Sequence, residues 1–200
     1  YTNFMEEEKN TFLYKCLRIP LVYKSYQNLI TKSNTYEYIY KNIFKSDNNS
    51  LVLDCGCGPA HYRKYLNCEK YYGIDFNKKH IKKAQQRYPN DEFINGNVIS
   101  YDFSQLPKFS DIIIFGLLHH LNDQNSINLI NKLLTKVKDK GKIVAIDPVY
   151  IYEEPSFYNK IANYIASKDQ GNFVRDKSGY KDLVENTNGR LEQKVLKNLL

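Results

Sequence analysis

A carboxylate, two glycines and two thiols stand close together just after the apolar run Leu51–Leu53, in the order Asp54-Cys55-Gly56-Cys57-Gly58-Pro59-Ala60. Thiols can ligate a metal ion, and glycines let the backbone approach a nucleotide-like ligand without a Cβ in the way. A carboxylate at the end of a strand can hold a cationic amino group. The stretch therefore indicates a metal site or a loop that binds a nucleotide-like ligand.

Zinc and a dinucleotide are two interpretations that the spacing disfavours. Cys55 and Cys57, with His61 and the distant Cys68, lack the paired two-residue spacing of strong zinc sites, and thiols at a strand end also serve as small packing residues. We expect no metal. An NAD or FAD loop needs a third glycine for close packing of helix on strand, and His61 occupies that position.

The segments that follow carry further polar residues at the ends of apolar runs. Asp75 stands 21 positions after Asp54, close to the ~20-residue interval at which a second-strand acid meets ribose hydroxyls. Gly96, Gly116 and Asp147 each follow a later apolar run. If these runs are parallel strands, all five residues lie along the edge of the sheet where ligands bind.

Apolar periodicity predicts the elements that would position these residues. Helices are predicted at 60–67, 77–88 and 123–139, the last with Gly141 as its C-cap. They alternate with short apolar strands, which implies right-handed crossovers and a mainly parallel sheet with helices on both faces, an α/β fold of the doubly wound, Rossmann-like kind. The predicted strands are Leu51–Leu53, Tyr71–Ile74, Glu92–Ile94, Asp111–Phe115 and Lys142–Ile146.

Taken in order, these segments resemble class I S-adenosylmethionine-dependent methyltransferases, whose loop is Asp/Glu-x-Gly-x-Gly-x-Gly. Ala60 stands where the family has its last glycine, and Leu118-His119-His120-Leu121 is similar to the family's Leu-His-His-Leu segment after the fourth strand. The resemblance covers residues 51–150 and implies S-adenosylmethionine as cofactor. The cofactor-binding residues that it implies are Asp54, Gly56, Cys57, Gly58, Asp75, Phe76, Gly96, Asn97, Val98, Gly116 and Leu117.

The resemblance also implies a role for the polar residues. Asp54 would hold the amino group of the cofactor, Asp75 its ribose hydroxyls, and Asn97 the adenine amino group, where the family commonly has an aspartate. Methyl transfer by in-line displacement asks mainly for alignment and exclusion of water, and a hydroxyl or ammonium acceptor also needs a base. His119 and His120 are the candidate catalytic bases. Because adjacent residues point in different directions, we expect one of them at most to face the acceptor, and packing is the alternative for both.

Composition indicates what kind of partner to expect. The chain has 200 residues, 42% of them hydrophobic, and a net charge of +7, enough apolar material for a full core. The densest basic cluster, Lys78, Lys79, Lys82, Lys83 and Arg87, has helical spacing and is interpreted as a solvated face, with a phosphate-binding patch as the alternative. We expect a small-molecule acceptor; an RNA methyltransferase and a binding module without turnover are the alternatives.

Location and domain organisation follow from the same sequence. The cysteines form no disulfide framework and no apolar run approaches ~18 residues, so a cytoplasmic protein without a membrane span is expected. The polar turn cluster Ser46–Ser50 divides a helical N-terminal cap or lid, 1–46, from a methyltransferase domain, 47–200. A sixth strand is predicted at 191–196 and no seventh fits, so the C-terminal antiparallel edge is expected to be incomplete. The oligomeric state is not indicated.

Overall fold

The structure is a computed structural model that describes residues 44, 47–150, 152, 163, 167 and 171–190. Apart from Phe44, the predicted N-terminal cap and the predicted strand at 191–196 lie outside the described residues. The fold is therefore described from the central domain and from the segment 171–190.

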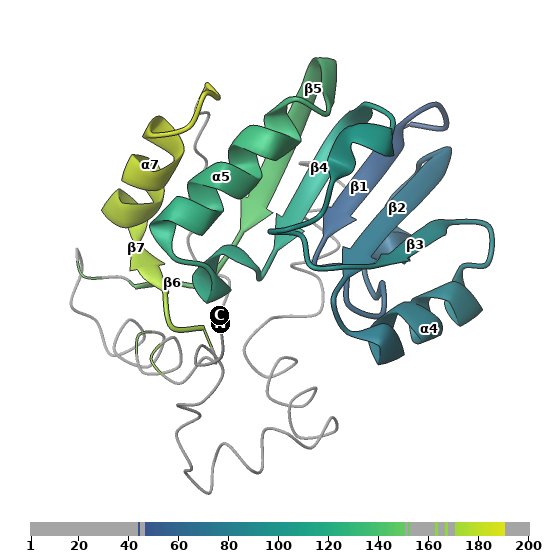
Figure 1. The fold of residues 1–200 in the computed structure, drawn as a ribbon, viewed down its shortest axis with the longest axis horizontal. Helices are drawn as coiled ribbons and strands as arrows, with labels where there is room; N and C mark the ends of the chain where they lie inside the picture. The colour runs from purple at the N-terminus through teal and green to yellow at the C-terminus, as the bar shows by residue number, and fades with distance from the viewer. Residues whose placement is uncertain are drawn as a thin grey trace, which may run out of the picture.

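The centre of the fold is a five-stranded sheet in the order β3-β2-β1-β4-β5, and every strand pair in it is parallel. The first strand, β1, lies in the middle of the sheet. The strands β2 and β3 follow on one side of it, and β4 and β5 follow on the other side (Figure 1). In a sheet of this topology, ligands bind beyond the carboxyl ends of the strands where the order reverses. The strands are β1 Leu51–Cys55, β2 Lys70–Asp75, β3 Glu92–Asn95, β4 Phe109–Phe115 and β5 Val137–Ile146.

The central strands are buried because helices cover both faces of the sheet. In β4, Ile112, Ile113 and Ile114 are all fully buried, which is the continuous apolar pattern typical of a parallel strand covered on both sides. Ile113 belongs to one hydrophobic cluster, whereas Ile112 and Ile114 belong to the other. The two clusters lie on opposite faces of the sheet, since alternate residues of a strand point in opposite directions.

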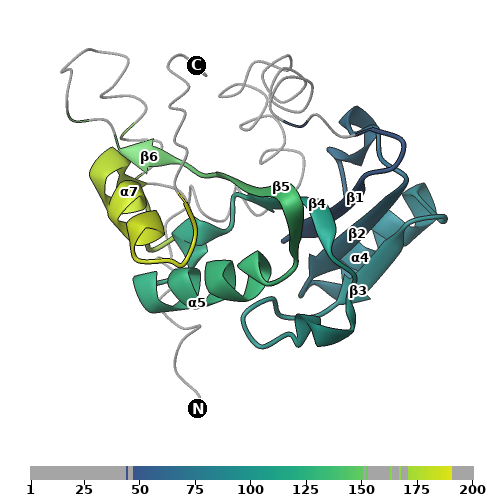
Figure 2. The same ribbon diagram turned by 90° about the horizontal axis from the view of Figure 1, so that it is seen from above.

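Each face receives its own helices. On one face α4, Lys78–Arg87, buries Ile81 and Ala84, and its first turn is capped by the side chain of Asn77. On the other face α5, Asp123–Leu134, packs together with α7, Lys177–Glu185 (Figure 2). The predicted Rossmann-like sheet with helices on both faces is thereby confirmed.

Two predicted helices differ from the observed ones. Only a 3-10 turn, η1 (Arg63–Tyr65), forms in the segment 60–67, because Ala60 is left-handed with φ 54° and the Arg63 guanidinium bonds the carbonyl oxygen of Leu66. The prediction of a helix to 139 was also wrong. The helix α5 ends at Leu134, and the chain enters β5 at once.

Gly141 is not a helix cap but part of β5. The ladder between β4 and β5 shifts register between Phe109 and Asp111, and the extra residues of β5 loop out there. A Cβ at Gly141 would stand 2.8 Å from the carbonyl oxygen of Ser110. The glycine is therefore needed for a close approach of two backbones at an irregularity in the ladder.

The segment after the sheet holds elements that the sequence did not predict. A short parallel pair joins β6, Val149–Tyr150, to β7, Arg175–Asp176. Asp176 then caps α7 by accepting a hydrogen bond from the Gly179 amide, and Leu183 inserts into the core under α5. This segment is thereby fastened to the same face of the sheet as α5.

A steric fit joins β2 to the loop that follows β1. Gly73 of β2 faces the side chain of Cys57, and a Cβ at Gly73 would lie 2.7 Å from Cys57 Sγ and 2.9 Å from Cδ1 of Phe93. Both distances are shorter than any ordinary carbon contact. The thiol of Cys57 therefore rests on β2 in space that only a glycine leaves open.

We expect Gly73→Ala to lower the free energy of unfolding by about 1–3 kcal/mol, since the added methyl overpacks a closed interior. Urea denaturation at equilibrium measures the change. The matched variant is Gly73→Ala with Cys57→Ala, which removes the closest clashing atom and should cost less than the two single substitutions added together. Strict additivity of the two effects would contradict the proposed contact.

Candidate functional site

The five residues predicted to lie along one edge of the sheet do so. Asp54 and Asp75 stand at the ends of β1 and β2, and Gly96, Gly116 and Asp147 directly follow β3, β4 and β5. Since all five strands are parallel, these positions share the carboxyl edge. The five positions therefore lie along one edge of the sheet, as the sequence predicts.

The loop after β1 turns sharply at its two glycines. Gly56 has φ 80° and Gly58 has φ 52°, values in the left-handed region that favours glycine. The amides of Gly56 and Cys57 both donate to the carbonyl oxygen of Ile74, which ties the loop to β2. A Cβ at Gly58 would meet nothing within 4 Å. The backbone at Gly58 thus borders open space, as a ligand-binding loop requires.

Asp75 holds the loop from the end of β2. Its Oδ2 accepts a hydrogen bond from the Gly58 amide at 2.9 Å, and its Oδ1 accepts one from the Asn77 amide at 2.8 Å. The imidazole of His80 lies 3.5 Å from Oδ1. Each carboxylate oxygen has two lone pairs, so each can accept one more hydrogen bond besides those from the backbone.

Asp54 is more deeply buried, with 4% of its surface exposed. Its Oδ2 accepts a hydrogen bond of 2.5 Å from the Tyr71 hydroxyl, and Oδ1 is buried with no hydrogen-bond partner in the described part of the chain. Burial raises the pKa of Asp54 to about 7; the Tyr71 hydrogen bond opposes this rise, and the nearby charge of Asp75 adds to it. A buried carboxylate oxygen without a donor is suited to an incoming cationic donor.

Four more of the predicted cofactor-binding residues, Phe76, Gly96, Asn97 and Val98, follow β2 and β3. Phe76 is 76% exposed, so its ring is available at the surface. The Gly96 amide donates to the carbonyl oxygen of Asp75, which brings the two strand ends together. Asn97 is exposed, and its Oδ1 accepts from the Ile99 amide. The side chain of Val98 is buried in the core.

Gly116 and Leu117 connect the end of β4 to the same loop. The Gly116 amide donates to the carbonyl oxygen of Ile146, which fixes the ends of β4 and β5 together. The side chain of Leu117 lies over Gly56, where a Cβ would be 3.6 Å from it. The loop after β4 therefore packs on the glycine loop after β1.

The two candidate bases differ in environment. His120 is exposed, whereas His119 is buried, and their ring centroids are 4.1 Å apart. Nδ1 of His119 lies 2.6 Å from Oδ1 of Asp147, and the same oxygen accepts a hydrogen bond from the His119 amide. The sequence analysis placed Asp147 along the ligand edge of the sheet but did not predict its bond to the His119 ring. This carboxylate holds both the 3-10 turn η3, Leu118–His120, and the imidazole.

Burial raises the pKa of Asp147, and its hydrogen bonds with His119 oppose that rise. Among the described residues, Oδ2 of Asp147 and the hydroxyl of Tyr180 are buried without a hydrogen-bond partner. Burial raises the pKa of Tyr180, and the charge of Asp147 adds to that rise. The amide of Phe173 donates to the carbonyl oxygen of His119, and Gly171 lies directly against the imidazole.

Arg175 fastens this cluster to the start of α5. Its guanidinium donates to the carbonyl oxygens of Leu118 and Leu121 and to the carboxylate of Asp123, at 2.6–3.1 Å. Four such bonds from one side chain are typical of a residue that fixes a loop. Arg175 was also missed by the sequence analysis.

The thiols of the glycine loop are packing residues. Cys55 and Cys57 belong to the clusters on opposite faces of the sheet, and burial raises the pKa of both. Nowhere in the described ranges do three or more His, Cys, Asp or Glu side chains come together as a possible metal site.

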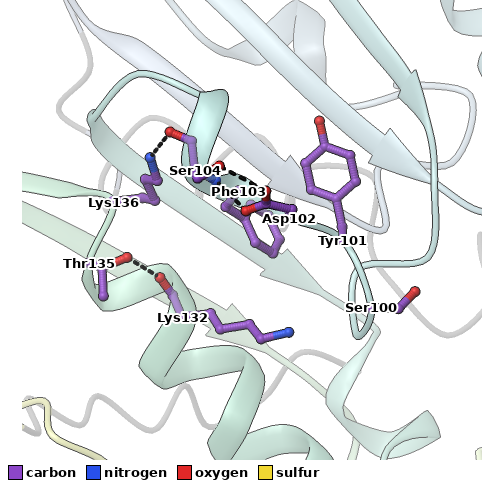
Figure 3. A pocket seen from close by; sticks show the side chains of 8 residues that line it. All are labelled: Ser100, Tyr101, Asp102, Phe103, Ser104, Lys132, Thr135 and Lys136. Carbon is purple, nitrogen blue, oxygen red and sulfur yellow. Dashed lines mark hydrogen bonds between the residues drawn. The ribbon is translucent and has the colours of Figure 1, made fainter.

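The described domain also has a pocket whose charged lysines are engaged by the backbone. It has a volume of about 380 Å³ and lies beside the start of β4, away from its carboxyl end (Figure 3). Its ammonium groups, from Lys132 and Lys136, donate to the backbone carbonyls of Ile99, Ser104 and Leu106. Its walls are Ser100, Tyr101, Asp102, Phe103, Ser104, Lys132, Thr135 and Lys136.

The basic residues of α4 are exposed, as expected of a solvated face. Arg87 is bonded to the carbonyl oxygen of Pro59 at 2.6 Å, so it helps to hold the glycine loop. Of the helices that the structure describes, none has the length and apolar character needed to cross a membrane.

Sequence comparison establishes the class of the protein. The chain belongs to a methyltransferase domain family, whose sequence profile matches residues 46–195. An uncharacterized methyltransferase of Alkaliphilus oremlandii is 24% identical over 128 residues, 63% of this chain and 57% of that protein. Trans-anol O-methyltransferase 1 of Pimpinella anisum is 26% identical over 77 residues, 38% of this chain and 20% of that protein. The chain spans less than two thirds of the length of either relative.

Solved structures of methyltransferases share the fold. A protein of Bacillus halodurans C-125 described as a methyltransferase has a TM-score of 0.63 and 17% identity, over 78% of this chain and 70% of its own. The plantazolicin methyltransferase BpumL, solved with S-adenosylhomocysteine, has a TM-score of 0.60 and 20% identity, over 83% of this chain and 66% of its own. Because the family profile matches residues 46–195, the predicted class, a class I S-adenosylmethionine-dependent methyltransferase, is confirmed, and S-adenosylmethionine is the cofactor of that class.

The buried carboxylate of Asp54 should make the stability of the folded protein depend on pH. Its folded-state pKa of about 7 lies above the ordinary value of 3.8, so the folded protein holds this proton more tightly than the unfolded chain does. The contribution of Asp54 to stability is then greatest below its ordinary pKa and is lost as the pH rises toward 7. Asn at this position cannot ionise and escapes the loss.

We therefore expect the stability of Asp54→Asn relative to the unsubstituted protein to rise by roughly 2–3 kcal/mol between pH 5 and pH 8. Urea denaturation of both proteins without ligand measures it. Asp139→Asn, at an exposed carboxylate of β5, is the control and should show little change. A constant difference between the two pH values for Asp54→Asn would contradict the raised pKa.

Proposed function

We propose that this protein transfers a methyl group from S-adenosylmethionine to a small-molecule acceptor by in-line displacement. The observation that carries the proposal is the buried Oδ1 of Asp54, which lacks a donor within the described residues and stands at the start of a glycine loop bordering open space. The cofactor's methionine part carries an ammonium group, and a cationic donor satisfies such an oxygen.

The residues present fit the cofactor on three further counts. Asp75 keeps lone pairs that can accept the ribose hydroxyls while it holds the Gly58 amide. Phe76 exposes a ring on which an adenine can stack. Gly96 and Asn97 follow the next strand, where an acceptor for the adenine amino group is expected; in that role the Asn97 side-chain oxygen would accept a second hydrogen bond besides that of Ile99.

When bound, the cofactor supplies an electrophilic methyl group on a good leaving group. The chain's own part is to hold it in line with the acceptor and to exclude water. Leu117 supports this by packing on the glycine loop from the β4 side. Cys57, Gly56 and Val98 contribute loop shape and core packing rather than polar contacts.

His119 is the proposed catalytic base, with Asp147 as the residue that orients it. A carboxylate 2.6 Å from Nδ1 keeps a proton on that nitrogen and directs the lone pair of the neutral ring to Nε2. This is the arrangement a general base needs. His120 is exposed, with its ring centroid 4.1 Å from that of His119, and we assign it a secondary role at the acceptor entrance.

The proposed acceptor carries a hydroxyl or an amine. The relative trans-anol O-methyltransferase 1 is named for transfer to oxygen, and a base such as His119 is useful for that transfer. The lysines of α4 point to no acceptor, since they form an exposed face without interleaved aromatic residues. The alternative functions are RNA methylation and cofactor binding without turnover, and the experiment below distinguishes them from the proposal.

Calorimetry with S-adenosylhomocysteine, beside a methyl-transfer assay on a panel of phenols, polyols and amines, tests the function. Binding with transfer to one class of the panel is expected. Binding without transfer to any of them, or transfer to RNA alone, would replace the proposal by one of the alternatives. Absence of binding would remove it.

In the same calorimetry, Asp75→Ala should weaken the binding of S-adenosylhomocysteine by roughly 1.5–3 kcal/mol, because charge-assisted hydrogen bonds and the hold on the Gly58 amide are both lost. Asp102→Ala is the matched control, since Asp102 also accepts a backbone amide, that of Ser104, but lies by the other pocket. Equal affinity in Asp75→Ala and the unsubstituted protein would show that Asp75 does not contact the ligand.

For the base, His119→Asn should lower kcat about 100-fold or more with the best acceptor, whereas the affinity for S-adenosylhomocysteine stays within a small factor. The asparagine amide can still donate to Asp147. His120→Asn is the control and should retain most of the rate. A kcat that is unchanged in His119→Asn would leave His119 with only its packing role.

A further inference from the structure

Tyr71 reaches Asp54 because of the register between β1 and β2. Asp54 is paired with Gly73, and Tyr71 is paired with Val52, two residues earlier. Residues 71 and 73 point to the same face of β2. Asp54, the partner of Gly73, lies on that face as well, and the Tyr71 hydroxyl stands 2.5 Å from its Oδ2.

The phenol ring is held firmly in this place. Tyr71 is fully buried, and its ring lies 5.8 Å from that of Phe93 and 5.7 Å from the guanidinium carbon of Arg63. Asp91 accepts hydrogen bonds from both the Tyr71 amide and the Arg63 guanidinium. Arg63 is therefore part of the support for Tyr71.

The groups around Asp54 oppose its ionisation, apart from Tyr71. Burial and the charge of Asp75 raise the pKa of Asp54, whereas the hydrogen bond from the Tyr71 hydroxyl lowers it. Burial raises the pKa of the Cys55 and Cys57 thiols, and the charge of Asp54 adds to the rise. A carboxylate in these surroundings needs a donor to remain charged.

We propose that Tyr71 is a positioning residue for the cofactor: its hydroxyl holds one oxygen of Asp54 and leaves the other as the charged acceptor for the cofactor's ammonium group. This inference rests on the proposed function, since it assumes that Asp54 meets that ammonium group. It adds a residue to the site that touches neither the cofactor nor the acceptor.

Cofactor binding should depend on pH through the ionisation of Asp54. An ammonium group binds the ionised form of Asp54, so affinity should increase as the pH rises through about 7 and then level off. Without the Tyr71 hydroxyl the carboxylate is harder to ionise, and the midpoint of the rise moves to higher pH. Below the midpoint, a shift of one pH unit corresponds to a ~10-fold loss of affinity.

The test compares two ligands on the full chain between pH 5.5 and 8.5 by calorimetry. S-Adenosylhomocysteine carries the ammonium group, whereas 5′-methylthioadenosine shares the adenosine and the thioether and lacks it. For Tyr71→Phe we expect the midpoint for S-adenosylhomocysteine to rise by about one pH unit, with ~10-fold weaker binding near pH 6. The binding of 5′-methylthioadenosine should be unchanged, which also shows that the variant is folded.

The matched control is Tyr72→Phe, the neighbouring tyrosine on the opposite face of β2, which packs on Phe109. It should keep the original profile for both ligands. If Tyr71→Phe keeps that profile as well, or weakens both ligands equally, Tyr71 has only a packing role and the inference fails.

Asp54→Asn separates this failure from a failure of the proposed function. If Asp54 meets the ammonium group, Asp54→Asn should weaken S-adenosylhomocysteine at pH 8 and make its binding independent of pH, and Tyr71→Phe should then add no further pH dependence. If Asp54→Asn leaves the affinity for S-adenosylhomocysteine unchanged, the proposed contact of Asp54 is itself wrong, whatever Tyr71 does.

Discussion

The site depends on two carboxylates, Asp54 and Asp75, buried at the ends of adjacent parallel strands. Like charges so placed disfavour each other, and each is stabilised by a donor from a different source. Backbone amides of the glycine loop and of Asn77 donate hydrogen bonds to Asp75, and the hydroxyl of Tyr71 donates one to Asp54. The loop conformation is therefore a consequence of charge burial as much as of glycine flexibility.

The carboxyl edge of the sheet divides into two regions with different bonding. Around β1 and β2, the glycine loop borders open space at Gly58, and the two acids stand beside it. Around β4 and β5, the His119 imidazole, Asp147 and Arg175 form a dense buried cluster that also ties down the segment 171–176. Such a division suits a protein that binds one ligand through charged side chains and places a second ligand against a fixed side chain.

The strands could be predicted because a parallel sheet covered on both faces leaves continuous apolar runs, as at Ile112–Ile114, each ended by a polar residue or glycine. Helix ends were harder: the apolar spacing of α5 continues smoothly into Val137, which is a residue of β5. The pairs Tyr71–Asp54 and His119–Asp147 could not be foreseen, since they join residues 17 and 28 positions apart through strand register. No local pattern in a single sequence records register.

The seat of the Cys57 thiol on Gly73, beside the ring of Phe93, has an evolutionary implication. Three positions on three segments share one small volume, so the size of any one of them limits the other two. Among relatives of this chain, residues 57, 73 and 93 should covary: a side chain bulkier than glycine in the second strand should accompany a smaller one in the loop or on the third strand. A family alignment would then record this contact as a correlated substitution pattern.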